Sequence, residues 1–568
     1  MIAFSTIYKG TFKSETEMEI ERIAAKLLPL IPSKVKHWLS VRATADPQMR
    51  ALIDRQIIMT ARKLLGDYES KLLLSLPPEN LSRGAFQFGT VLYEKEKWLF
   101  GLSESELLQN LAIFGRSGAG KTNVAFHLLE QLSEKGIPFL FLDWKRTGRH
   151  LLPRLKRKVN VYTPGRSLSP LAFNPFIAPP GIESHVYIQQ VVDVLGDAYT
   201  LGDGAKSLLL KALSQLQAKS SDPPNVQKIL EAVEALETKE RARGWKLSAV
   251  RALETLSHAK LLADNPATQQ ETMHSLLKES SILELNGLSQ STKAFLIPIL
   301  CLWLYYVKLS STEREKLSLV ILIEEAHHVL YSGNRKHESL MEMLLRQCRE
   351  LGMCFIVVDQ HPSLISRAAL GNVYTTICLN LKDSADINKA AAVSLLEKEE
   401  KQYLSMLPIG QGIVKLQDRW RRPFLVQFPL VSFKKGAIGD EPLRDYLDNP
   451  SQFRSSINHK SDTLGLLDLN NRHLGTFGRS PTVDNVFTEE AVMLIKDVLQ
   501  YADSGVDARY KRMGMSVEKG NRLKNQLVKA GVLESLEVSA GNTRRVVLRP
   551  TAKAREELGL DKGELTRE

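Results

Sequence analysis

Eight consecutive residues have the types and spacing needed to hold the phosphates of a nucleotide. They read Gly115, Arg116, Ser117, Gly118, Ala119, Gly120, Lys121 and Thr122. This is the pattern G-x-x-x-x-G-K-[ST], between an apolar run and a helical pattern. Glycines let backbone N–H groups close around phosphate oxygens, while Lys121 would meet the β- and γ-phosphates and Thr122 would bind Mg²⁺. The alternative is a glycine-rich turn without a ligand, but the full match in a strand–loop–helix context favours binding of ATP or GTP.

An acidic pair follows a second apolar run. Residues 318–323 read Ser-Leu-Val-Ile-Leu-Ile, and Glu324 and Glu325 come directly after them. Glu324 is predicted to hold the Mg²⁺ shell, and Glu325 to polarise a water for in-line attack on the γ-phosphate. Two acids are common at the end of any strand, so the prediction of ATP hydrolysis depends on their pairing with the phosphate loop.

An amide follows a third apolar run. Gln360 comes after the run 354–359, and its amide could hydrogen-bond both the γ-phosphate and the attacking water. A surface turn built on Pro362 is the competing account. Spacing alone does not decide between them.

Length and composition bound the kind of protein. The 568 residues predict two or three domains. The formal net charge of +12 permits an anionic partner, and 43% hydrophobic with 25% charged residues excludes wholesale disorder. Four unpaired-looking cysteines predict reduced thiols rather than a disulfide framework or a zinc site. The longest apolar run, 294–307, has 14 residues against the roughly 20 that a bilayer span needs, so we expect no membrane span, no secretory signal and a cytoplasmic protein.

The elements that must position these residues change character along the chain. Residues 1–85 have helical periodicity. From 86 to 433, short β-prone runs alternate with helices, which predicts an α/β domain with a mostly parallel sheet. A mainly helical insertion is expected at about 184–280. Residues 434–485 are rich in Gly, Asn, Ser and Asp and are predicted to be a linker.

Residues 486–568 show the order helix, helix, helix and two strands, which is typical of a winged helix-turn-helix. In its last helical pattern, 516–530, Leu523, Leu527 and Val528 are expected to face inward. The basic residues predicted to contact DNA lie on that helix and on the wing: Lys519, Arg522, Lys524, Arg544 and Arg545. Many winged helices bind proteins instead, and basic residues are often simply solvated.

Together these pieces resemble the HerA/FtsK superfamily of DNA translocases, most closely HerA-like ATPases, over about 86–430. The stretches that carry the resemblance are 88–92, the phosphate loop, 141–145 (Phe-Leu-Asp-Trp-Lys), 323–327 (Ile-Glu-Glu-Ala-His), and 349–352 leading to 359–362 (Asp-Gln-His-Pro). The resemblance implies a RecA-like P-loop core that assembles as a ring, expected to be a hexamer, around double-stranded DNA. It also implies an arginine that acts across the subunit interface, for which Arg349 fits best and Arg346 lies one turn earlier. Either can instead be an ordinary surface arginine.

Two features depart from the family pattern. Glu324 stands where the family usually has aspartate, and 1–85 look helical where HerA proteins begin with a small β-barrel. The leading hypothesis is an ATP-driven double-stranded DNA translocase or helicase that works with a separate nuclease or effector in DNA processing or antiphage defence. The alternatives are an ATP-gated DNA-binding regulator and a soluble motor for DNA transfer or export.

Overall fold

The computed structural model forms two units, 1–453 and 454–568, which are described separately. It describes residues 15–66, 72–94, 96–220, 223–260, 266–331, 333, 338–431, 433, 436–450, 453, 494–495, 497–498, 501, 504–529, 532–540 and 543–551.

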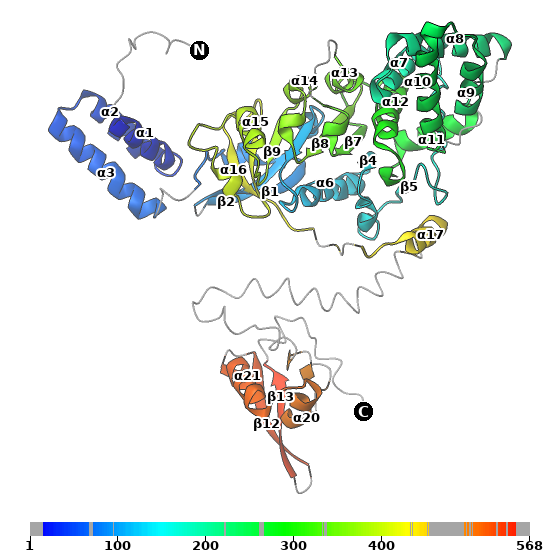
Figure 1. The fold of residues 1–568 in the computed structure, drawn as a ribbon. Coiled ribbons are helices and arrows are strands. Elements are labelled where there is room, and N and C mark those ends of the chain that lie inside the picture. The colour runs from blue at the N-terminus through cyan, green and yellow to red at the C-terminus, as the bar shows by residue number, and fades with distance from the viewer. Residues whose placement is uncertain are drawn as a thin grey trace. The chain divides into compact units, whose positions relative to one another are not determined.

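The first unit is built on one large sheet (Figure 1). Its eleven strands, counted over the described residues, lie in the order β2-β1-β11-β10-β9-β3-β8-β7-β4-β6-β5. The neighbours from β9 to β5 are parallel, whereas β10, β11, β1 and β2 are antiparallel to their neighbours. The strands are β1 (Phe86–Tyr93), β2 (Glu96–Leu102), β3 (Leu111–Phe114), β4 (Phe139–Asp143), β5 (Asn160–Tyr162), β6 (Ser281–Glu284), β7 (Leu319–Glu324), β8 (Met353–Asp359), β9 (Thr375–Cys378), β10 (Gln411–Lys415) and β11 (Phe424–Gln427). The prediction of a mostly parallel α/β sheet is confirmed.

The central strands are buried on both faces, which is why they read as continuous apolar runs rather than alternating ones. Every residue of β3, β4, β7 and β8 is buried. Asn110, directly before β3, has a left-handed backbone conformation with φ = 68°. Its side chain donates to the carbonyls of Leu345 and Asn372 and accepts from the N–H of Phe355, at 2.9 Å each. Asn110 therefore ties the start of β3 to β8.

Shorter helices and loops connect the strands. These connecting helices include α4 (Glu79–Ser82), α5 (Glu104–Leu107), α6 (Lys121–Lys135), α13 (Leu340–Gln347), α14 (Arg367–Gly371), α15 (Ser384–Ser394) and α16 (Tyr403–Met406). Of these, α6 follows the phosphate loop directly and ends at Gly136, which has φ = 72°.

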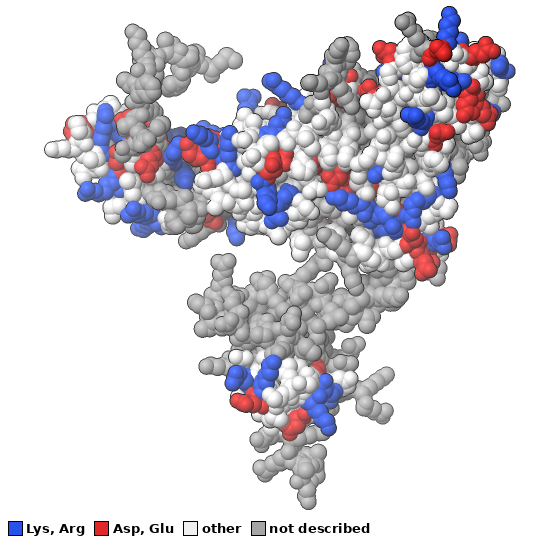
Figure 2. Space-filling model, in the orientation of Figure 1, with Lys and Arg blue, Asp and Glu red and all other residues white. Residues whose placement is uncertain are grey.

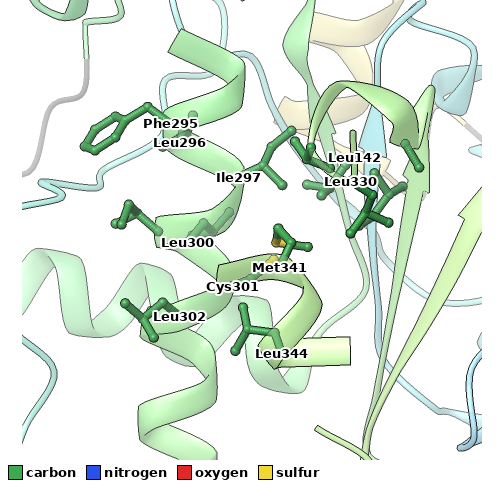
Figure 3. Close-up of a cluster of buried hydrophobic side chains, with 14 of the residues drawn as sticks. Leu142, Phe295, Leu296, Ile297, Leu300, Cys301, Leu302, Leu330, Met341 and Leu344 are labelled. Carbon is green, nitrogen blue, oxygen red and sulfur yellow. The ribbon is translucent and has the colours of Figure 1, made fainter. Parts of the chain in front are cut away.

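The region 184–280 forms a group of helices beyond one end of the sheet (Figure 1). They are α7 (Ser184–Tyr199), α8 (Asp203–Lys219), α9 (Val226–Ala235), α10 (Glu240–Ser257) and α11 (Pro266–Lys278). The helix α12 (Gln290–Leu309) packs against α7 and α13 and presents Leu296, Leu300 and Cys301 to a buried cluster (Figure 3). Among the described residues, α12 alone is long and apolar enough to cross a bilayer, and 67% of its most apolar window is buried inside the unit.

The N-terminal helices form a core of their own. They are α1 (Glu15–Leu27), α2 (Pro32–Thr44) and α3 (Pro47–Leu65). Ile23, Leu27, Val35 and Ile57 are among the residues that meet between them. The hydroxyl of Tyr93 in β1 donates to the carbonyl of Lys26 and so connects this bundle to the sheet.

The start of the expected linker is instead structured. Residues Asp440–Asp448 form α17, and the Tyr446 hydroxyl both accepts from the N–H of Val159, at 2.9 Å, and donates to its carbonyl, at 2.8 Å. The helix is held by ion pairs and by two buried side chains, Leu443 and Tyr446, and the mainly polar composition of 434–450 did not reveal it. The remainder of the expected linker, from 454 to 485, lies outside the described residues.

The second unit contains α20 (Val506–Arg512), α21 (Val517–Lys529) and a hairpin of β12 (Leu533–Ala540) with β13 (Thr543–Pro550). Leu523 and Leu527 are buried in its core, but the expectation for Val528 was wrong, because this side chain is 36% exposed. The buried Arg509 donates to Asp497 at 2.8 Å, and Arg512 donates to the same carboxylate at 2.9 Å. Both arginines therefore take part in an internal ion-pair cluster.

Candidate active site

The phosphate loop lies between the end of β3 and α6. Gly118 (φ = 79°) and Gly120 (φ = 110°) have left-handed backbones that favour glycine. The Lys121 ammonium folds back over the loop and donates to the carbonyls of Gly115, at 2.6 Å, and Arg116, at 3.1 Å. Burial lowers the pKa of Lys121 to about 8, and the charge of Glu325 partly offsets that effect. Arg116 is held at the opposite side by Asn380, whose Oδ1 accepts from its Nε at 2.7 Å.

Glu324 ends β7 in a buried position suited to a cation. Its Oε2 is buried and has no hydrogen-bond partner among the described residues. Burial and the nearby Asp143 raise the pKa of Glu324 to about 8. A bound Mg²⁺ would supply the missing partner and favour the charged carboxylate, so Glu324 together with Thr122, in the first turn of α6, fits such an ion.

Glu325 lies one residue beyond the strand, in a left-handed conformation (φ = 47°) that is unusual for a non-glycine residue. Its Oε1 accepts from the ammonium of Lys145 at 2.5 Å and from the amide of Gln360 at 2.8 Å. Burial alone would raise the pKa of Glu325, but these two donors hold it below its ordinary value. Glu325 is thus an ionised carboxylate, able to accept a proton, in contact with the amide at the end of β8.

Asp359 connects the segments that carry Glu325 and Gln360. One of its oxygens accepts from the N–H of His327 at 2.6 Å and the other from the N–H of His361 at 2.7 Å. The His327 ring also lies 2.9 Å from this carboxylate, and that hydrogen bond raises the pKa of His327. Burial would raise the pKa of Asp359, but its hydrogen bonds to His327 and His361 lower it. A single buried carboxylate therefore sets the spacing of the two segments.

Arg349 lies at the end of the sheet where β3 and β8 begin, opposite the end that carries the phosphate loop. It follows α13 and precedes β8, and its guanidinium donates to Gln109, just before β3, at 3.3 Å. Glu325 and Gln360 lie at the opposite ends of the strands, and seven residues of β8 span about 20 Å. Arg349 thus cannot reach the phosphate loop of its own chain. Arg346 pairs with Glu338 at 2.7 Å.

The candidate DNA-binding residues all lie in the second unit. Lys519 and Arg522 are exposed on α21, and Arg522 is 4.0 Å from Glu518. Lys524 is half-buried on the same helix. Arg544 and Arg545 lie in β13, opposite Ser539 and Val538 of β12.

Three site residues were not assigned a role from the sequence: Asp143, Lys145 and Asp359. Asp143 is fully buried and accepts from the N–H groups of Lys145 and Gly148. Asp143 and Asp359 each end an apolar strand beside the phosphate loop, as Glu324 does. That shared position was the available signal, whereas nothing in the sequence pairs Lys145 with Glu325.

A phosphate loop beside two neighbouring strands that end in acids, within a mostly parallel sheet, defines a P-loop ATPase with a RecA-like core. Residues 86–302 match the family model described as the central domain of helicase HerA. This part of the chain is therefore similar to the central domain of HerA. A search of curated proteins found no match.

Two of the solved structures that match this chain are TrwB and VirB4. The plasmid coupling protein TrwB in complex with ADP and Mg²⁺ is 14% identical, with 59% of this chain and 89% of that chain covered and a TM-score of 0.47. VirB4 of Thermoanaerobacter pseudethanolicus is 16% identical, with 61% and 96% covered and a TM-score of 0.49.

Proposed function

We propose that this protein is a ring-forming ATPase that moves along double-stranded DNA, acting with a separate nuclease or effector in DNA processing or antiphage defence. The observation that carries the proposal is the contact between Glu325 and Gln360 beside the phosphate loop. A protein that only senses ATP needs a phosphate cradle, but it has no need of an ionised carboxylate hydrogen-bonded to an amide where the γ-phosphate and attacking water would lie.

The steps follow from the positions of the side chains. Lys121 and the backbone N–H groups of 115–122 would hold the phosphates, and Thr122 and Glu324 would hold the Mg²⁺, which neutralises charge on the phosphates. Glu325 would orient the attacking water and take its proton, while Gln360 positions both the water and Glu325. In this scheme, negative charge that develops on the γ-phosphate during hydrolysis still lacks a positively charged partner.

Arg349 would supply that charge from a neighbouring subunit. Arg349 lies at the opposite end of the strands from Glu325, so it cannot act on the active site of its own chain. In a head-to-tail ring, different surfaces of adjacent subunits meet, which brings Arg349 of one subunit toward the active site of the next. We expect a hexamer, as the resemblance to HerA implies, in the cytoplasm.

Contact with DNA is assigned to the second unit as a winged helix-turn-helix, with α21 in the major groove and the β12–β13 hairpin as the wing. The exposed Lys519 and Arg522 support this assignment, whereas Arg509 and Arg512 are used by Asp497. On the face shown in Figure 2, acidic and basic side chains are interspersed over the helices around α8 and α9. Deletion of 486–568 should weaken DNA binding and spare basal ATP hydrolysis. Unchanged DNA affinity would assign this unit to protein contacts.

The test of the whole proposal is ATP hydrolysis with and without linear double-stranded DNA, alongside mass by light scattering. We expect stimulation by DNA in a species near six times the 63.7 kDa of one chain. Turnover indifferent to DNA, in a monomer or dimer, would instead support an ATP-gated DNA-binding regulator. A ring that hydrolyses ATP only with added membrane components would support a motor for DNA transfer or export.

A further inference from the structure

Two apolar side chains stand out of the surface beside the phosphate loop. Leu430 is 84% exposed and Ile409 is 70% exposed, the two highest values among the large apolar side chains of the described residues. Exposed apolar area of this kind is unfavourable in water and often marks a binding site.

Hydrogen bonds of the neighbouring residues place both side chains beside the loop. The N–H of Gly410, next to Ile409, donates to the carbonyl of Ala119 at 3.4 Å. Asn123 donates to the carbonyl of Pro429 and accepts from the N–H of Val431, at 2.6 Å each, so the two neighbours of Leu430 are fixed to α6. The N–H of Phe428 donates to the carbonyl of Gly410 at 2.8 Å, which joins the two segments.

The sheet order tells which end of a nucleotide would lie there. Glu325 and Gln360 follow β7 and β8, on one side of β3, and they mark the γ-phosphate end. Ile409 precedes β10 and Leu430 follows β11, and both strands lie on the other side of β3. Because the base and the γ-phosphate are at opposite ends of a nucleoside triphosphate, the base would extend toward Ile409 and Leu430.

Two polar side chains beside this surface, Asn123 and Gln427, already make hydrogen bonds to the backbone. The Asn123 amide uses both its nitrogen and its oxygen on the 429–431 backbone, and the Gln427 amide nitrogen donates to the carbonyls of Gly410 and Phe428. The contact available to a base is therefore mainly apolar, and apolar contact distinguishes poorly between rings that differ in their hydrogen-bonding edges.

We propose that Ile409 and Leu430 form the walls of the site for the nucleotide base, and that this site accepts adenine and guanine with similar affinity. The proposal rests on the proposed function only in requiring that the phosphate loop binds a nucleoside triphosphate.

The experiment compares the binding of ATP, GTP and inorganic tripolyphosphate by the full chain and by its Leu430→Ser and Ile409→Ser variants. We expect each substitution to weaken ATP and GTP about tenfold, as the loss of apolar contact in a pocket does, and to leave tripolyphosphate binding unchanged. In the unmodified protein, ATP and GTP should bind within about tenfold of each other. Leu247→Ser, at a 49% exposed leucine on α10, is the matched control and should change nothing.

Other outcomes overturn the proposal in distinguishable ways. Unchanged ATP affinity in both variants removes the base contact, and an equal loss for tripolyphosphate shows a distorted phosphate loop instead. If the variants form a smaller oligomer by light scattering but bind ATP with unchanged affinity, the two side chains contact a second copy of the chain instead. Discrimination of ATP over GTP by more than about a hundredfold contradicts an apolar site. Failure of the unmodified protein to bind either ATP or tripolyphosphate would refute the proposed function itself, whereas absence of DNA stimulation would leave this result standing.

Discussion

At the scale of single residues, Glu325 has the properties of a base held ready for proton transfer. Lys145 and Gln360 both donate to Oε1 and lower its pKa, so the group is ionised at neutral pH. Its left-handed backbone conformation costs about 1–3 kcal/mol and persists only where the surroundings enforce it. The hydrogen bond from the N–H of His327 to Asp359 is part of that enforcement.

Replacing Glu325 by glutamine should abolish proton acceptance while keeping the size of the side chain. We expect ATP hydrolysis, measured by the phosphate produced, to slow by about 10²–10⁴-fold, with ATP affinity little changed. Glu350→Gln is the matched control, because Glu350 is an exposed acid before β8, at the opposite end of the strands from Glu325. Turnover near that of the unmodified protein would remove Glu325 from catalysis.

Asp359→Asn tests whether one carboxylate positions Glu325 and Gln360. An asparagine has one oxygen for the two backbone N–H donors, so the N–H of either His327 or His361 would face an NH₂ group. Leaving a buried donor without a partner costs about 1–3 kcal/mol, and we expect kcat to fall by at least about tenfold with little change in ATP affinity. If ATP affinity and melting temperature fall together with kcat, Asp359 has a general structural role instead.

At the scale of elements, α17 is attached to the sheet by charge. Asp440 pairs with Arg146 at 2.6 Å, with Arg149 at 3.1 Å and also with Arg166, and Arg149 binds the buried Glu284 at 2.6 Å. The ion-pair cluster therefore fixes α17 to the segments that follow β4 and β5.

Asp440→Asn should therefore loosen α17, with faster proteolysis in 440–450, while Asp445→Asn on the same helix should not. Burial alone would raise the pKa of Asp440, but Arg166 and Arg149 hold it below its ordinary value. The attachment is then fully present at neutral pH and is lost as pH falls through that lowered pKa. Equal proteolysis of both variants would contradict the role of the cluster.

At the scale of the whole molecule, the separation of Arg349 from Glu325 would make catalysis a property of the proposed ring. An Arg349→Ala chain keeps its own phosphate loop, and a Lys121→Ala chain keeps its arginine. In an equal, random mixture, about a quarter of the interfaces combine an intact loop with an intact arginine, so we expect hydrolysis near a quarter of normal. A mixture no more active than its two components would leave Arg349 without a role across the interface.

The sequence by itself determined what depends on contiguous residues. The phosphate loop needs only eight residues between a strand and a helix, and strands buried on both faces must be apolar throughout, so 111–114, 139–143, 319–324 and 353–359 could be found from composition. The tertiary structure alone decided which strands are neighbours, and so brought Lys145, Glu325 and Gln360 together from positions up to 215 residues apart. It also decided that Asn110 joins β3 to β8 and that 440–448 is a helix, because both depend on partners that lie hundreds of residues away in the chain and leave no local pattern.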